Sequence, residues 1–186
     1  MNDRRTIGLF GGSFDPPHAG HRQVSLTALN ALKLDAVWWL PTPQNPLKPH
    51  APDTAEKRLE ACREYADHPR ITVCDIEMQH GLTHSIDTVR LLQKRHPRHR
   101  FVWIMGADAW ASFHRWKDWR TLAETLPIAV HPREGATLKA ASCPAGVALA
   151  GARKSSASSF AAAPAPAWIL LSGANHPASS SALRDT

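Results

Sequence analysis

Residues 11–21 read Gly11-Gly12-Ser13-Phe14-Asp15-Pro16-Pro17-His18-Ala19-Gly20-His21, and this stretch decides the fold. It follows a short apolar run, Ile7-Gly8-Leu9-Phe10, and it opens a segment of helical periodicity. A strand, a glycine turn and a helix in that order bring main-chain N–H groups and the positive end of a helix dipole close to an anion. The stretch therefore predicts a phosphate site at the start of a helix.

His18 and His21 add side-chain donors to that predicted site. The two histidines are three positions apart, so they share one face if the first helical turn includes His18. Both rings can then donate a hydrogen bond to the same phosphate. We therefore expect a nucleotide to bind here.

Size and composition bound the class of protein. The 186 residues suffice for one α/β domain, and we treat residues 1–186 as that domain. The apolar stretch near the N-terminus is too short for a signal peptide, and no run approaches membrane-spanning length. We expect a soluble, cytoplasmic protein with no membrane partner. The three widely spaced cysteines predict reduced structural thiols, since their number and spacing suit neither disulfides nor zinc.

The chain is basic, with a formal net charge of +6 and a pI near 9.7, which suits a polyanionic ligand. A cluster of arginines and lysines between Arg90 and Arg100 offers a nucleic-acid site as one alternative. That cluster lacks the interleaved aromatic residues of a single-strand stacking platform, so we interpret it as a solvated helix end and loop. Our expectation is that nucleic acid is not a partner.

Strand-like and helix-like runs alternate along the chain, which favours parallel strands with covering helices. We predict an α/β fold, a Rossmann-like open parallel sheet with helices on both faces, in a single domain. The segment Gly135–Pro166 is rich in Ala, Ser and Pro, and we expect a variable, partly mobile excursion there, with a poorly patterned helix as the alternative. The alternating runs are Thr6–Phe10 and Gly20–Leu32, Ala36–Leu40 and Thr54–Tyr65, Ile71–Cys74 and Ser85–Gln93, Phe101–Met105 and a short helix from Ala107, then Ile128–Val130 and Trp168–Leu171.

Open parallel sheets bind ligands outside the carboxyl ends of their strands, near a switch in strand order. The candidate residues follow that rule. His18 and His21 come after the first predicted strand, Pro41–Lys48 after the second, Asp108 after the fourth and His131–Arg133 after the fifth. We therefore expect these distant segments to converge on one crevice.

The stretch Gly11 to His21 resembles the glycine-rich turn and HxGH element of class I nucleotidyltransferases. Outside Gly135–Pro166 the whole chain resembles the bacterial nicotinate-mononucleotide adenylyltransferase family. The resemblance implies an enzyme of NAD biosynthesis that joins ATP and nicotinate mononucleotide into deamido-NAD and pyrophosphate. It implies catalytic roles for His18, His21 and Arg184. It also implies ATP contacts from Gly11, Gly12, Ser13, Phe14, His18, Gly20, His21, Gly106, Asp108, Ser180, Ser181 and Arg184.

Two further segments carry the resemblance. Gly106-Ala107-Asp108 is similar to the family's GxD element, whose aspartate contacts ribose hydroxyls; a helix N-cap is the alternative role of Asp108. In Phe113–Trp119, Trp116 matches the tryptophan that stacks on the pyridine ring, and Lys117 beside it is a candidate for substrate contact. The alternative for Trp116 is a place in the core, where we expect Trp38, Trp39 and Trp103 to lie.

The remaining candidates lie on loops. Ser85, which ends the loop Gln79–Ser85, matches the hydroxyl that receives the nicotinate carboxylate, with an ordinary N-cap as the alternative. In the proline-rich loop Pro41–His50, Lys48 is the candidate that reaches toward phosphate. Arg133 stands in an REG sequence where the family has RPG, which weakens its match. Residues 178–184 resemble the family's ISxTxIR element, in which Ser181 and Arg184 would bind the triphosphate beside Ser180.

The resemblance also bears on mechanism and partners. The phosphate of the mononucleotide is already anionic near neutral pH, so catalysis needs positioning and charge stabilisation rather than a general base. Magnesium is expected to accompany ATP, held mainly by phosphates and water. A homo-oligomer is left open. The alternatives are another adenylyltransferase of the superfamily, such as a pantetheine-phosphate enzyme, and a non-catalytic nucleotide-binding regulator.

Overall fold

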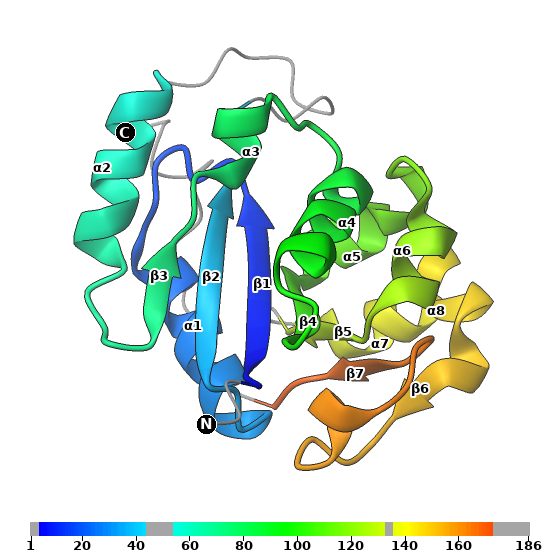
Figure 1. The fold of residues 1–186 in the computed structure, drawn as a ribbon. Coiled ribbons are helices and arrows are strands. Elements are labelled where there is room, and N and C mark those ends of the chain that lie inside the picture. The colour runs from blue at the N-terminus through cyan, green and yellow to red at the C-terminus, as the bar shows by residue number, and fades with distance from the viewer. Residues whose placement is uncertain (1–3, 44–53, 133–135, 173–186) are drawn as a thin grey trace.

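Strand β1 (Thr6–Gly12) occupies the interior of a seven-stranded sheet whose order is β3-β2-β1-β4-β5-β7-β6 (Figure 1). The computed structural model describes residues 4–43, 54–132 and 136–172. All neighbouring strands in it are parallel. The other strands are β2 (Ala36–Pro41), β3 (Ile71–Val73), β4 (Arg100–Gly106), β5 (Ile128–His131), β6 (Arg153–Lys154) and β7 (Trp168–Leu170).

Both faces of the sheet are buried, as the apolar strands require. Ile7 and Leu9 of β1 pack into one cluster, whereas Phe10 packs into the other, because successive side chains point to opposite faces. The first cluster lies under α3 (Ile76–His80), α4 (Ser85–Arg95), α5 (Ala107–Ser112) and α6 (Trp119–Thr125), and under α8 (Pro144–Ala148). The second lies under α1 (Ala19–Ala31), α2 (Ala55–Tyr65) and η3 (Phe160–Ala162).

The order of the strands places the switch point between β1 and β4. The chain builds outward from β1 through β2 to β3, and then it returns to the other side of β1 as β4. The register pairs Phe10 with Ile104, so the strand ends at Gly12 and Gly106 lie level with each other. Ligands of open α/β sheets bind at such a point, outside the carboxyl ends of the strands.

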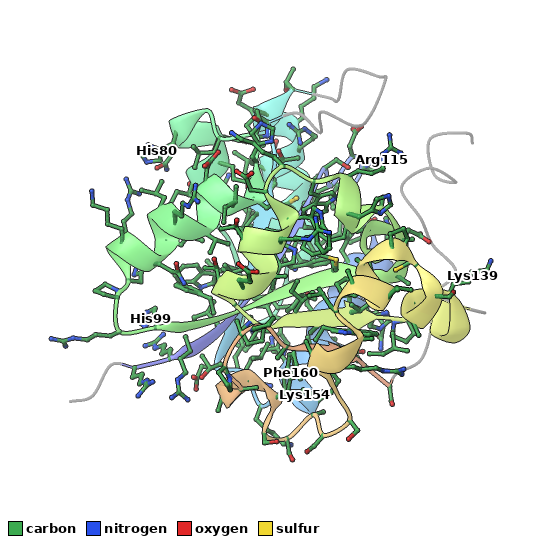
Figure 2. The ribbon with its side chains drawn as sticks, turned by 90° about the vertical axis from the view of Figure 1, so that its right-hand side faces the viewer. His80, His99, Arg115, Lys139, Lys154 and Phe160 are labelled. Atoms are coloured by element: carbon green, nitrogen blue, oxygen red, sulfur yellow. The ribbon has the colours of Figure 1, made fainter. Side chains whose placement is uncertain are left out.

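The carboxyl ends of β1 and β2 lie at the upper end of the molecule (Figure 1). Helix α3 lies beyond the carboxyl end of β2, against which it packs (Figure 1). Figure 2 shows His80, at the end of α3, and Arg115, in η1 (Phe113–Arg115), at this upper end of the molecule, whereas His99, just before β4, lies lower. None of the helices in the described ranges is long and apolar enough to cross a membrane.

The fold predicted from the sequence is confirmed. Every predicted strand is present within one or two residues of its expected ends, and the sheet is parallel and covered by helices. Helices α3 and α6 lie in stretches that the sequence analysis left as loops. The N-cap of α3 makes no side-chain hydrogen bond, and the helix is only five residues long, so it lacks a sequence signal.

The segment Gly135–Pro166 contains short helices, as in the alternative that the sequence analysis left open, and its variability stays a prediction. Within its described residues lie α7 (Ala136–Ser142), α8, η2 (Ala150–Ala152), β6 and η3. The Phe160 side chain is 1% exposed and belongs to the core beneath the sheet. The periodicity is weak because alanines and a glycine let the short helices approach through their backbones, rather than through large apolar side chains.

Gly146 in α8 tests this close packing. A Cβ atom at this position would overlap the Ala140 carbonyl oxygen and lie 2.8 Å from that of Ala141. Replacing a helical glycine by alanine ordinarily stabilises a helix, by about 1 kcal/mol. We expect Gly146→Ala to destabilise the protein instead, by about 1–3 kcal/mol in denaturant unfolding, because backbone must move.

Gly151→Ala in η2 is the matched control. A Cβ atom there would meet nothing within 4 Å, so its effect should stay within about 0.5 kcal/mol. A stabilised Gly146→Ala variant would mean that α7 and α8 are not held together as the structure shows.

Candidate active site

The start of α1 is built by two histidines that cap each other's backbone. His18 is the N-cap, with φ −155° and ψ 169°, and its Nδ1 accepts a hydrogen bond from the Gly20 N–H at 3.1 Å. His21 Nδ1 in turn accepts from the His18 N–H at 3.2 Å. The pair thus performs the reciprocal bonding that Ser or Thr with Glu performs in an ordinary capping box.

This capping determines which ring nitrogen carries the proton. A nitrogen that accepts an N–H bond holds a lone pair, so each ring bears its hydrogen on Nε2. The two ring centroids are 3.9 Å apart, as expected for side chains on one face of the first turn. His18 is 8% exposed and His21 is half-buried, so the rings are held at the surface of the crevice. The start of α1 therefore presents oriented Nε2–H donors beside the main-chain N–H groups.

The glycine turn is shaped by aromatic packing. A Cβ atom on Gly11 would come within 2.9 Å of the Trp103 ring, so only glycine lets Trp103 lie across β1. Phe14 adopts φ 45°, a left-handed backbone rare outside glycine, and its ring stacks on Trp39 at 4.9 Å. The Phe14 side chain is fully buried, and its ring centroid lies 4.6 Å from that of His21. Phe14 therefore supports His21, and only its main chain can face a ligand.

Asp108 lies across the switch point, in the first turn of α5. The N-cap of α5 is Gly106, so the alternative in which Asp108 caps this helix is wrong. The Asp108 side chain is exposed, and no atom lies within 4 Å of a Cβ built on Gly106. Open space beside Gly106 and an exposed Asp108 thus lie at the carboxyl end of β4, level with the carboxyl end of β1 from which the histidine turn leaves.

The tryptophans differ in burial, and Trp116 and Trp38 pack against the edge of the first core cluster. Trp39 and Trp103 are at most 1% exposed, as predicted, whereas Trp38 is only partly buried. Trp116 is half-buried and stands edge-to-face to Trp103, with ring centroids 6.2 Å apart and planes at 89°. The Trp103 indole N–H has no hydrogen-bond partner among the described residues. Lys117 is exposed, and its Nζ lies 3.8 Å from the Asp87 carboxylate on α4.

Ser85 is the first residue of α4, and His84 is its N-cap. The N-cap alternative for Ser85 is therefore wrong. Within the described part of the chain the Ser85 hydroxyl makes no hydrogen bond, and its side chain is half-buried. The hydroxyl is thus placed where it could receive a ligand, beside the loop that joins α3 to α4.

A buried carboxyl that the sequence analysis missed anchors this loop. Glu77 in α3 is 4% exposed, and the Thr88 hydroxyl of α4 donates to its Oε1 at 2.8 Å. Burial raises the pKa of Glu77 to about 7, against the hydrogen bonds from Thr88 and Thr42, which lower it. Glu77 therefore connects the end of β2, at Thr42, with α4.

Arg58 of α2 is a second buried group that the sequence analysis missed. It is 3% exposed, and its Nη1 donates to the main-chain oxygens of Ser13 at 2.8 Å and Thr42 at 2.7 Å. Its Nη2 donates to the Pro43 oxygen at 2.9 Å. The sequence signal is the stripe of Arg58, Cys62 and Ala66 at a spacing of four, which puts an arginine on the face that α2 buries.

A cavity elsewhere on the molecule is not part of this arrangement. It has a volume of about 390 Å³, and its lining includes Lys154, Ser156 and Phe160 beside β6. Figure 2 shows Lys154 and Phe160 at the opposite end of the molecule from Arg115. The candidate site is therefore the switch point at the carboxyl ends of β1 and β4, which His18 and His21 follow on one side and Asp108 on the other.

Comparison with known proteins agrees with this geometry. A family model described as cytidylyltransferase-like matches residues 9–186. A probable nicotinate-nucleotide adenylyltransferase of Ruegeria pomeroyi is 52% identical over 78% of this chain and 68% of its own length. One from Cereibacter sphaeroides is 47% identical over 84% of each chain. The chain belongs to the nicotinate-nucleotide adenylyltransferase family.

Solved structures show the same fold at low sequence identity. The nicotinic acid mononucleotide adenylyltransferase of Plasmodium falciparum, complexed with NaAD, superposes with a TM-score of 0.71 and 18% identity. That match covers 97% of this chain and 83% of the other. The doubly covered parallel sheet is thus the architecture of this family.

Several residues predicted from the family motifs lie outside the described residues. They are Lys48 of the proline-rich loop, Arg133, and Ser180, Ser181 and Arg184 near the C-terminus. Their roles stay predictions. Gly20 is described, buried in the first turn of α1 with its N–H donating to His18 Nδ1, and its contact with ATP also stays a prediction.

Glu77 should give the stability of this protein a measurable pH dependence. Its folded pKa of about 7 lies above its ordinary value of 4.5, so ionising the folded carboxyl is unfavourable. The contribution of Glu77 to stability should therefore fall as the pH rises from 4.5 through about 7, and this contribution should change no further above that range. Glu77→Gln stays neutral and keeps the acceptor for Thr88, so it should gain thermal stability over the wild type as the pH rises.

The measurement is thermal unfolding of both proteins across that pH range. Burial also raises the pKa of the neighbouring Cys74 thiol, and the comparison cancels its contribution because both proteins retain it. Parallel stability curves for the two proteins would contradict a protonated Glu77.

Proposed function

We propose that this chain transfers the adenylyl group of ATP to nicotinate mononucleotide, giving deamido-NAD and pyrophosphate. The observation that carries the proposal is the His18 and His21 pair, whose reciprocal Nδ1 caps leave both Nε2–H groups as donors at a helix start. Relatives at 47% to 52% identity carry the corresponding name. A helix N-terminus with two added donors suits the phosphates of a nucleotide.

The reaction can be assigned to residues of this chain. A phosphate oxygen of the mononucleotide attacks the α-phosphorus of ATP, the new P–O bond forms, and the bond to the leaving pyrophosphate breaks. Negative charge builds on the oxygens around the α-phosphorus, where the Nε2–H groups of His18 and His21 donate. Donors that are already oriented stabilise that charge without having to reorganise. No side chain need remove a proton, because the attacking phosphate is anionic.

The other residues bind and orient the two reactants. Asp108 accepts hydrogen bonds from ribose hydroxyls on the β4 side of the crevice. Trp116 stacks on the pyridine ring, with Trp103 and Phe113 holding its indole at nearly perpendicular contacts. Ser85 donates to the nicotinate carboxylate. Lys48 and Arg184 would neutralise phosphate charge, and Lys117 and Arg133 would add substrate contacts.

Magnesium is expected to enter with ATP. In the ranges that the structure describes, no three His, Cys, Asp or Glu side chains cluster as metal ligands. Mg²⁺ keeps several waters and commonly takes oxygens from substrate phosphates, which fits a site built of N–H donors. When bound, the ion neutralises part of the charge on the phosphates, and the residues above keep their roles in orienting them.

Asparagine substitutions separate the capping role of the histidines from their donor role. Asn is a good N-cap whose Oδ1 stands in for Nδ1, but it has no group in the place of Nε2. We expect His18→Asn and His21→Asn to unfold at nearly the wild-type temperature. Turnover at saturating substrates should fall on the order of a hundredfold, because a lost transition-state donor costs about 3 kcal/mol.

The matching alanine variants are the controls. His18→Ala should lose the donor and also about 1 kcal/mol of helix capping. Near-normal turnover in both asparagine variants, measured as pyrophosphate release, would remove the histidines from the mechanism.

The choice of mononucleotide tests the function itself. The loop before α4 is expected to offer N–H and O–H donors, which match a carboxylate because it only accepts. A carboxamide would turn its own N–H₂ toward some of those donors, at a cost of roughly 1–3 kcal/mol per unpaired group. With ATP and magnesium, we expect nicotinate mononucleotide to be preferred over the nicotinamide form by at least about a hundredfold in kcat/KM.

Ser85→Ala should reduce that preference while leaving the KM for ATP unchanged. Comparable kcat/KM values for the two mononucleotides would overturn the assignment of the loop but leave adenylyl transfer standing. If the enzyme releases no pyrophosphate with either mononucleotide, the proposed function is overturned.

A further inference from the structure

Arg58 joins two loops that approach the crevice from different strands. The Ser13 oxygen belongs to the glycine turn after β1, and the Thr42 and Pro43 oxygens belong to the chain that leaves β2. A second contact binds the same loops together, because the Thr42 N–H donates to the Gly12 oxygen at 3.0 Å. One guanidinium thus satisfies main-chain oxygens on both sides of this contact.

The chemistry of Arg58 favours a positioning role. Its planar fork holds donors at fixed angles, which a lysine ammonium on a flexible stem does not. The side chain is 3% exposed, so its hydrogen bonds act in a medium of low dielectric constant. Burial raises the pKa of Cys62, one turn further along α2, to about 12, so this thiol stays neutral beside the guanidinium. Three hydrogen bonds of the guanidinium go to main-chain oxygens, which ties its position to the backbone of the two segments.

We propose that Arg58 is a positioning residue that locks the glycine turn to Thr42 and Pro43 after β2, and so aligns the two reactants. The inference rests on the proposed function, since it assigns the glycine turn to the phosphates of ATP. Arg58 itself touches main chain rather than substrate. Its effect therefore falls on the geometry in which two bound molecules meet.

The kinetic test uses Arg58→Met, which keeps the aliphatic stem and removes the donors. We expect kcat to fall by about tenfold to a hundredfold, because small misplacement of reacting groups is costly. The KM values for ATP and nicotinate mononucleotide should each stay within about threefold, since neither ligand loses a direct contact. Arg58→Lys keeps the charge and should recover only part of kcat.

Arg63→Met is the matched control, because Arg63 is an exposed arginine on the same helix. It removes the same charge and should leave kcat unchanged. An equal loss of kcat in both variants would show a general charge effect and overturn the proposal. A wild-type kcat in Arg58→Met with a lowered unfolding temperature would show a purely structural role and also overturn it.

A second measurement does not depend on catalysis. Hydrogen exchange at the Thr42 amide reports the contact with Gly12 directly, and it should quicken by about tenfold in Arg58→Met, relative to amides in the middle of β2. Unchanged exchange at Thr42 would overturn the lock between the loops. If the wild-type protein releases pyrophosphate with neither mononucleotide, the proposed function fails, and the exchange measurement alone decides whether Arg58 holds the loops.

Discussion

The reciprocal capping of α1 is the interaction on which the fold and its chemistry both depend. The first N–H groups of a helix need acceptors, and here the Nδ1 atoms of His18 and His21 supply two of them. Because those nitrogens accept, the opposite nitrogens must donate, so the bonds that begin the helix also prepare the site. The ring of Phe14 holds His21 from behind and is itself stacked on Trp39. The hydrophobic core therefore determines the direction in which the histidine donors point.

Buried polar groups also fix the backbone positions of the neighbouring segments relative to one another. Arg58 joins the glycine turn to the chain after β2, and Thr42 continues the connection to Glu77, which is bonded to Thr88 of α4. Such groups are costly to leave unpaired in a low dielectric, so each one specifies a single arrangement of the backbone around it. The glycine turn, the chain after β2 and α4 are thereby held by one continuous set of hydrogen bonds.

The sequence was sufficient for six of the seven described strands, and among these it missed only β6, whose two residues are exposed and lie in the Ala/Ser/Pro-rich segment. Apolar runs bounded by turn residues located the strands, and the turn from Gly11 to His21 located the switch point. Arg58 and Glu77 escaped because a charged residue on a helix is ordinarily exposed, and only the folded packing shows otherwise. The helices after residue 135 escaped for the opposite reason, since alanine and glycine pack through the backbone and leave no stripe of large apolar side chains.

The division of charge in the chain bears on how the reaction would be accelerated. The histidine donors at the start of α1 are N–H groups whose directions are set by the Nδ1 hydrogen bonds, whereas Lys48, Arg133 and Arg184 are candidate cations. A diffuse positive charge attracts bound ATP and the transition state alike, which favours binding without favouring the chemical step. A donor aimed at a fixed point responds to the direction in which new charge develops. Under the proposed function, selective stabilisation of the transition state therefore depends on the start of α1, and so on the core beneath it.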